Sequence, residues 1–258
     1  MQNNTFFSVI IPNYNNGEWL EKSINSIFQQ TFTNYEVIIV DDCSTDNSID
    51  IIKKYNKINL IQCKEKAFNG GSRNLGIKQA KGEYILFLDS DDWFYNNKCF
   101  ENIYNTIIEN NYPDCVNLSY NCLIGNDESY QSLVRNNQQE LVESLFVACW
   151  TKCIKRELIQ PFPENTLMED VVQHIRQCDI LKTIVSIDSP IIVWNRNNMN
   201  SCSKEENQKC QRGKWQSSMY RYAADLMDLQ CESECCEKHR QWRLEIVLNN
   251  IKENRYIQ

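Results

Sequence analysis

Acidic and amide side chains follow each strand-like run in the first third of the sequence. The four groups are Pro12-Asn13-Tyr14-Asn15, Asp41-Asp42-Cys43-Ser44, Asn69-Gly70-Gly71 and Asp89-Ser90-Asp91-Asp92. Carboxylates that converge repel one another unless a cation or hydrogen-bond donors stabilise them. Mg²⁺ and Mn²⁺ prefer oxygen ligands, and an ion held by one or two carboxylates keeps coordination positions for phosphate oxygens. The pattern therefore predicts a hard divalent ion that binds a diphosphate.

Each group also has a structural interpretation when it is taken alone. Asp41 and Asp42 fit turn chemistry, Asp46 fits a helix N-cap, and a DxD sequence occurs by chance in acidic loops. Gly70-Gly71 has no third glycine or lysine at the spacing of a nucleotide fingerprint, which excludes both a GxGxxG motif and a P-loop. The informative feature is the joint placement of the carboxylates after successive strands.

The charge balance restricts the class of ligand. The 258 residues carry 27 Lys+Arg against 34 Asp+Glu, a formal net charge of -7. Proteins that bind nucleic acid through its phosphates need a surplus of cationic side chains. Nucleic acid is therefore excluded as the main partner, whereas a nucleotide bound through a metal ion is not.

The sequence also indicates a cytoplasmic protein. Its apolar runs fall short of the about 18 to 20 residues that a membrane span needs. The N-terminus lacks the basic region of a signal peptide. The 13 cysteines are an odd number without a CxxC pair, so we expect reduced thiols rather than a disulfide framework or a zinc site.

The first 96 residues alternate short β-rich runs with segments of helical spacing, which is typical of a parallel sheet with crossover helices. We expect strands at 6–11, 35–40, 59–63 and 83–88, and helices at 18–30, 48–55 and 72–80. Ligands of such sheets bind beyond the carboxyl ends of the strands. The four polar groups are therefore expected at one edge of the sheet.

The pattern is less regular after residue 96. We expect helices at 98–109 and 169–181, strands at 114–124 and 183–194, a loop at 126–139, and short helical pieces at 141–149 and 155–159. From residue 203 the chain is charged and helical, with a break near Cys231. The fold class is α/β.

Four segments, taken in order, resemble the successive motifs of family 2 of the inverting glycosyltransferases. They are residues 9–15 (VIIPNYN), 36–46 (EVIIVDDCSTD), 72–76 (SRNLG) and 82–93 (GEYILFLDSDDW). Residues 150–170 are similar to the acceptor-side segment of bacterial polysaccharide members, and residues 194–203 resemble their aromatic-Arg-Ser segment more loosely. The resemblance implies the GT-A fold, a mostly parallel central sheet flanked by helices. It implies a transferase domain over 1–203, with a nucleotide-binding half at 1–96 and an acceptor half at 97–203. The expected helical extension at 204–258 rests on its residue pattern alone and carries no resemblance to the family.

The resemblance also implies roles for individual residues. Pro12, Tyr14 and Asn15 would line the nucleotide site, and Asp41 would accept a hydrogen bond from the imide nitrogen of uracil. Asp89 and Ser90 would lie near the ribose or the metal, and Asp91 would coordinate the metal that bridges the diphosphate. Arg73 would meet a phosphate or a sugar, with a structural surface salt bridge as the equal alternative.

Asp170 would be the general base of the transfer, with its neighbour Glu169 as the alternative. We interpret His174, one turn later, as a surface or packing histidine. One position departs from the family pattern: the residue after Asp42 is usually glycine, but here it is Cys43, which raises the question of whether the donor-site turn is kept.

We therefore expect a metal-dependent transferase that uses Mn²⁺ or Mg²⁺ and moves a sugar from a UDP-sugar to a glycan or lipid-linked saccharide in cell-surface polysaccharide synthesis. A sugar nucleotidyltransferase and a non-catalytic nucleotide-sugar-binding module are the alternatives. The segment after Ser203 mixes basic with aromatic residues and is left open between a contact with the inner face of the cell membrane, a homodimer contact and a solvated appendage. Its basic residues are Lys204, Lys209, Arg212, Lys214 and Arg221, and its aromatic residues are Trp215, Tyr220 and Tyr222.

Overall fold

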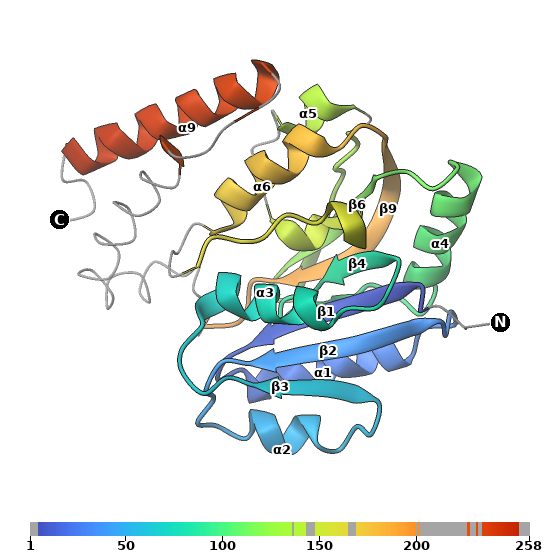
Figure 1. Cartoon of the computed structure of the whole chain (residues 1–258). Coiled ribbons are helices and arrows are strands. Elements are labelled where there is room, and N and C mark those ends of the chain that lie inside the picture. The colour runs from blue at the N-terminus through green and yellow to red at the C-terminus, as the bar shows by residue number, and fades with distance from the viewer. Residues whose placement is uncertain are drawn as a thin grey trace.

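The computed structural model describes residues 5–135, 137–142, 148–164, 169–199, 201, 226–227, 231 and 234–252. The described chain folds as one mixed sheet with helices on both faces (Figure 1). The elements of the first half are β1 (Phe7–Asn13), α1 (Gly17–Phe28), β2 (Tyr35–Asp41), α2 (Ser48–Ile52), β3 (Ile58–Gln62), α3 (Phe68–Gln79), β4 (Tyr84–Phe87), β5 (Trp93–Phe94) and α4 (Cys99–Glu109). Those of the second half are β6 (Cys115–Ile124), β7 (Asp127–Gln131), α5 (Gln138–Val142), β8 (Lys152–Lys155), α6 (Glu169–Ile180), β9 (Ile184–Asn195) and α9 (Glu234–Lys252), with short 3₁₀ turns at Cys149–Thr151 and Arg156–Leu158.

The sheet has the strand order β3-β2-β1-β4-β8-β6-β9-β5, and β7 extends it by pairing with β6. Strands β1 to β4 are parallel to one another, as the sequence predicts, and their carboxyl ends share one edge. Strand β8 runs antiparallel to both of its neighbours, β4 and β6. The mixed α/β sheet flanked by helices confirms the predicted fold class, with parallel pairing among β1 to β4 and between β6 and β9.

Alternation along β1 decides which helix covers which face of the sheet, because successive side chains of a strand point to opposite faces. A Cβ atom added to Gly76 of α3 would lie 2.4 Å from Ile10, so α3 packs on the Ile10 face. The Phe7 ring contacts Phe100 of α4 instead, which places α4 on the other face. All residues of β1 are buried, as expected for a strand that is covered on both sides.

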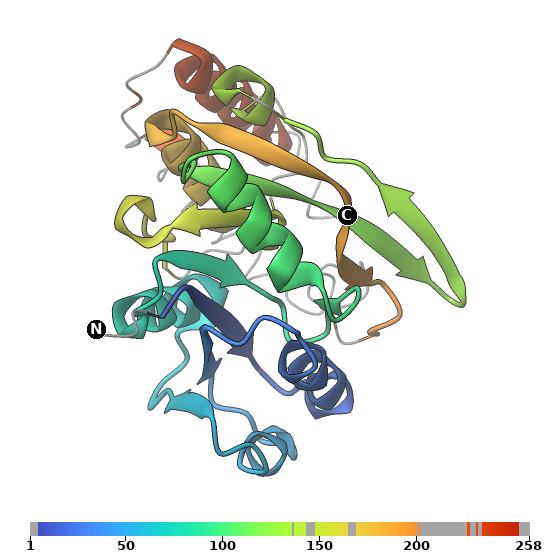
Figure 2. The same ribbon diagram turned by 90° about the vertical axis from the view of Figure 1, so that its right-hand side faces the viewer.

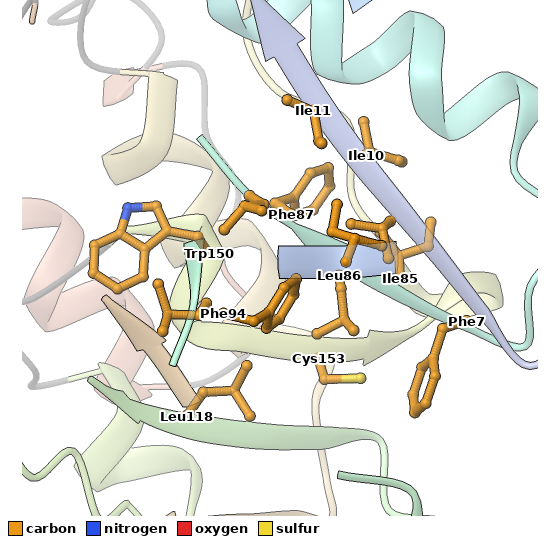
Figure 3. Close-up of a cluster of buried hydrophobic side chains, with 14 of the residues drawn as sticks. Phe7, Ile10, Ile11, Ile85, Leu86, Phe87, Phe94, Leu118, Trp150 and Cys153 are labelled. Atoms are coloured by element: carbon orange, nitrogen blue, oxygen red, sulfur yellow. The ribbon is translucent and has the colours of Figure 1, made fainter. Parts of the chain in front are cut away.

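The main core lies at the junction of the two halves. Figure 3 shows side chains of β1 and β4 meeting Phe94 of β5, Leu118 of β6, Trp150 and Cys153. Strand β8 provides the junction, since Cys153 is paired with Leu86 on one side and with Val116 on the other. The first and second halves of the sheet therefore share one continuous core.

In the second half, one predicted loop was wrong and one strand was missed. Residues 126–139 are not all loop, because β7 forms a hairpin with β6 that projects from the body of the molecule (Figure 2). Every residue of β7 is exposed, so its sequence lacks the apolar alternation by which a strand is identified. Residues 152–155 form the strand β8, for which no strand was predicted; only Lys155 falls within a predicted helical piece. The strand is too short for periodicity to identify it.

A second apolar cluster joins α6 to the C-terminal helix. Cys236 of α9 and Leu226 are fully buried against Val172 and Ile175 of α6. His174 also belongs to this layer: it is buried, and its Nε2 lies 3.1 Å from the carbonyl oxygen of Leu141, so it is a packing histidine. The basic and aromatic residues between 204 and 222 lie outside the described residues. No helix in the described ranges has the length and apolarity that a bilayer crossing requires.

The aromatic packing of α4 generates a stability prediction. The Phe100 ring lies 5.7 Å from that of Phe7, 5.1 Å from Tyr35 and 4.7 Å from Phe94. Removing it leaves a cavity in a core that relaxes only in part, so we expect Phe100→Ala to lower the free energy of unfolding by about 3–5 kcal/mol. Ile108→Ala on the exposed side of the same helix should change it by less than about 0.5 kcal/mol. Urea denaturation of both variants compares them directly, and equal losses would contradict the packing assigned to α4.

Candidate active site

The edge formed by the carboxyl ends of β1 and β2 is tied together by Asp41. Asn13 and Asp41 are paired across the two strands, and Asn13 Nδ2 donates to Asp41 Oδ1 at 2.8 Å. The backbone N–H of Ser44 donates to Asp41 Oδ2 at 2.9 Å. Pro12 lies buried one residue earlier on β1. Asp41 thus lies at the predicted edge, with its carboxylate orientation fixed by its own loop.

Asn15 joins the loops that follow β1 and β2. Its Oδ1 accepts the backbone N–H groups of Thr45 at 2.7 Å and of Asp46 at 3.3 Å. Its φ of 47° lies in the left-handed region, which asparagine tolerates better than most residues. Asp46 in turn accepts the N–H of Gly17 and the N–H of Ser48, the first residues of α1 and α2. These two residues connect the loops to both helices.

Cys43 occupies the position in the turn after β2 where the family pattern usually has glycine. It adopts a φ of 61°, a conformation in which a Cβ atom is costly and glycine is not. Its thiol donates to the carbonyl oxygen of Cys63 at 3.3 Å, which anchors the turn against the end of β3. The turn is therefore kept without glycine.

Asp42 organises the segment that enters α3. Its carboxylate accepts the N–H groups of Ala67 at 2.6 Å and of Phe68 at 3.1 Å. Lys66 donates to the Asp42 carbonyl at 2.8 Å, and its ammonium lies 2.6 Å from the centroid of the Tyr14 ring. Tyr14 is 49% exposed, so part of its ring remains accessible at this edge beside the Lys66 ammonium.

Asp89, Ser90, Asp91 and Asp92 form the loop after β4, where carboxylates crowd together. Burial and the nearby Asp89 charge raise the pKa of Asp91 to about 6. Burial, followed by the charges of Asp91 and Asp89, also raises the pKa of Asp92. Ser90 is buried and accepts a hydrogen bond from Asn16 Nδ2 at 2.9 Å. The loop therefore holds negative charge at an electrostatic cost that a bound cation would relieve.

Arg73 connects this loop to the start of α6. Its guanidinium donates to Asp89 Oδ1 at 2.9 Å, to Glu169 Oε1 at 2.8 Å and to Asp170 Oδ1 at 3.3 Å. Only 2% of the Arg73 side chain is exposed, so the expected alternative of a surface salt bridge is wrong. Burial within the α3 layer accounts for the difference, and Arg73 is the centre of a buried ion-pair network.

Glu169 and Asp170, the two acidic residues at the start of α6, differ in solvent exposure. Burial, and then the Asp170 charge, raise the pKa of Glu169 to about 7, against the lowering effect of Arg73. Burial also raises the pKa of Asp170, with Arg73 lowering it and Asp89 raising it. The Asp170 side chain is 28% exposed, whereas that of Glu169 is 7% exposed. Asp170 is therefore the carboxylate that an outside hydroxyl can reach.

The residues of the β4 loop suit a divalent ion that is completed by its ligand. Within the described ranges, no group of three or more His, Cys, Asp or Glu side chains forms a metal cage. Asp89 and Asp91 nevertheless supply two nearby carboxylates, and burial together with the Asp89 charge raises the pKa of Asp91. This donor set fits Mg²⁺ or Mn²⁺ held by one or two carboxylates together with phosphate oxygens.

Two residues at this site were missed in the sequence. Asn198, which follows β9, donates to Asp91 Oδ2 at 2.8 Å, although it lies more than a hundred positions from Asp91 in the chain. Lys152 at the start of β8 is only 1% exposed, and its ammonium donates to the carbonyl oxygen of Ala148 at 3.1 Å. Asn198 stands in an asparagine-rich segment and Lys152 in a short apolar run, so nothing in the local sequence predicts that either side chain is buried at this site.

Comparisons with known proteins agree with the fold. Residues 8–185 match the family described as Glycosyl transferase family 2. GlyG, a glycosyltransferase of Streptococcus pneumoniae, is 30% identical over 212 residues, which cover 73% of this chain and 70% of GlyG.

TarS of Staphylococcus aureus, a poly(ribitol-phosphate) beta-N-acetylglucosaminyltransferase, is 46% identical over 93 residues, which are 34% of this chain and 16% of TarS. The chain thus matches about a sixth of the length of this relative. The crystal structure of TarS residues 1–349 in complex with UDP-GlcNAc superposes with a TM-score of 0.72 at 26% identity, covering 95% of this chain and 72% of that structure.

The Arg73 network generates a second stability prediction. Arg73→Met would leave Glu169, Asp170 and Asp89 without their shared cation in a buried site, so we expect a loss of about 3–5 kcal/mol in the free energy of unfolding. Lys54→Gln removes an ion pair to Glu21 whose side chains are 59% and 50% exposed, and should cost less than about 1 kcal/mol. Chemical denaturation near pH 8 measures both, and wild-type stability of the Arg73 variant would contradict the network.

Proposed function

Because this chain belongs to glycosyl transferase family 2, we propose that it transfers a sugar from a nucleotide donor to a hydroxyl group, with inversion at the anomeric carbon. The observation that carries this proposal is the Arg73 bridge, which sets the Asp89 carboxylate of the β4 loop beside Asp170 of α6. The Arg73 guanidinium therefore holds the Asp89 carboxylate, on the proposed diphosphate side, beside the accessible carboxylate of Asp170 in the proposed acceptor half.

We infer that the donor is a UDP-sugar. A structure named for its complex with UDP-GlcNAc shares this fold at 26% identity over most of the chain. In this chain Tyr14 offers an exposed ring on which a base can stack, beside Pro12 and Asn15. Asp41 would accept the imide N–H of uracil, which adenine does not possess.

We infer that Asp89 and Asp91 hold the divalent ion. When bound, Mn²⁺ or Mg²⁺ supplies Lewis-acid stabilisation for the charge that develops on the leaving diphosphate. Ser90 lies between the two carboxylates and is held by Asn16. Arg73 keeps Asp89 at the inner side of the loop, so the carboxylates are oriented before the donor arrives.

We assign the general base to Asp170. The acceptor hydroxyl would transfer its proton to the Asp170 carboxylate as its oxygen attacks the anomeric carbon from the face opposite the diphosphate. One such displacement inverts the configuration and needs no second nucleophile. A base positioned in this way contributes about 10²- to 10⁴-fold to the rate. Glu169 is held on Arg73 and is too deeply buried to meet the acceptor.

The acceptor is proposed to be a glycan or a lipid-linked saccharide of cell-surface polysaccharide synthesis. Relatives with partial coverage are named for such polymers, TarS for poly(ribitol-phosphate) and TuaG of Bacillus subtilis for teichuronic acid biosynthesis. We place the reaction in the cytoplasm, at the inner face of the membrane where the acceptor is lipid-linked. The family assignment favours sugar transfer over nucleotidyl transfer or binding alone.

Asp170→Asn tests the base. The amide keeps the shape of the side chain but cannot accept the proton, so we expect kcat for transfer to fall by about 10²- to 10⁴-fold. The affinity for UDP, measured by calorimetry in the presence of Mn²⁺, should remain near the wild-type value. Asp50→Asn on the exposed side of α2 is the matched control and should leave transfer unchanged. Wild-type turnover of Asp170→Asn with the productive UDP-sugar would exclude Asp170 as the base.

Metal removal tests the role of the β4 loop. Exhaustive treatment with EDTA should abolish UDP release from a UDP-sugar, because the charge on the leaving diphosphate is then uncompensated. Added Mn²⁺ should restore it in the wild type. Asp91→Asn should need a much higher Mn²⁺ concentration for the same rate, since one ligand loses its charge. Full activity in the presence of excess EDTA would refute metal dependence.

A further inference from the structure

Asn198 is buried at the point where three separate segments of the chain meet. It is 3% exposed, and its amide nitrogen donates to Asp91 Oδ2 at 2.8 Å and to Asn16 Oδ1 at 3.0 Å. Asn16 in turn donates a hydrogen bond from its amide nitrogen to Ser90 Oγ at 2.9 Å. The loop after β1, the loop after β4 and the segment after β9 are thereby joined through neutral amides.

The neighbouring residues fix the position of Asn198. The backbone N–H of Arg196 donates to the carbonyl oxygen of Leu123 at 2.9 Å. The Asn197 side chain accepts the N–H of Gly125 at 2.6 Å and donates to the Gly125 carbonyl at 2.9 Å. The turn after β9 is therefore attached to the tip of the β6–β7 hairpin, and Asn198 approaches Asp91 from an anchored backbone.

The same turn holds the adjacent carboxylate. The backbone N–H of Asn195, the last residue of β9, donates to Asp92 Oδ1 at 2.8 Å. Two consecutive acidic residues of the β4 loop thus receive donors from one turn, one from a backbone N–H and one from a side-chain amide. An amide is suited to this place because it fixes a carboxylate by hydrogen bonding without neutralising the charge that a cation needs.

We propose that Asn198 is a positioning residue of the donor site, which orients the Asp91 carboxylate for the divalent ion. This inference rests on the proposed function, in which Asp91 is a ligand of that ion. Outer partners that hydrogen-bond a coordinating carboxylate set its direction, and their loss typically costs 10- to 100-fold in metal affinity or activity. The acceptor half, through the end of β9, thus completes a site whose ligands come from the nucleotide half.

Asn198→Leu removes both hydrogen bonds while keeping a side chain of similar size. We expect the Mn²⁺ concentration at half-saturation, measured by electron paramagnetic resonance in the presence of UDP, to rise by about 10- to 100-fold. The kcat/KM for the UDP-sugar should fall by a similar factor. Asn198→Ala is made in parallel, so that poor folding of the leucine variant does not decide the result.

Gln30→Leu is the matched control. Gln30 is another buried amide, which donates to the carbonyl oxygens of Ser26 at 3.0 Å and of Asn96 at 2.7 Å. Its loss removes these hydrogen bonds at the far end of α1, so it should lower the melting temperature without a comparable rise in the Mn²⁺ half-saturation. A merely structural Asn198 would behave like this control, losing thermal stability while Mn²⁺ affinity stays at the wild-type value, and this outcome would overturn the inference.

Asp91→Asn separates the inference from the proposed function. If Asp91→Asn weakens Mn²⁺ binding but both Asn198 variants bind as the wild type does, the positioning role fails and the metal assignment stands. If Asp91→Asn itself binds Mn²⁺ normally, the metal assignment fails and the inference fails with it.

Discussion

The buried guanidinium of Arg73 is the interaction on which the rest of the site depends. A cation with a side chain only 2% exposed needs several carboxylates to offset its desolvation. Those carboxylates come from β4 and from the start of α6, so their distances from one another are set by one planar donor. Asp89 and Asp170 can therefore serve different chemical steps while remaining parts of one rigid arrangement.

The same constraint explains why the surroundings are rich in neutral amides. Carboxylates that must stay available to a cation cannot all be paired with lysine or arginine. Asn13 holds Asp41, and Asn198 holds Asp91. Asn15 adopts a left-handed backbone conformation, in a chain that has only 7 glycines. Asparagine thus supplies both the hydrogen bonds and the turn geometry of the catalytic edge.

Support for the acceptor side comes from farther away. Helix α6, which begins with Glu169 and Asp170, buries Val172 and Ile175 against Cys236 of α9. The C-terminal helix is therefore packed on the element that presents the proposed base. The β6–β7 hairpin supports the opposite side, because it anchors the turn that reaches the β4 loop. The second half of the chain, whose pattern is less regular, thus completes a site whose proposed metal ligands come from the first half.

Local order in the sequence determined the first four parallel strands, their helices and the placement of Asp41, Asp89 and Asp91 at one edge, because periodicity and strand ends are local features. It did not determine β7, whose residues are all exposed, or β8, which is too short for a period. Only the tertiary structure decided that Arg73 is buried, that Asp170 is more accessible than Glu169, and that Asn198 reaches Asp91. Those three facts depend on contacts between residues some hundred positions apart, and no local pattern encodes them.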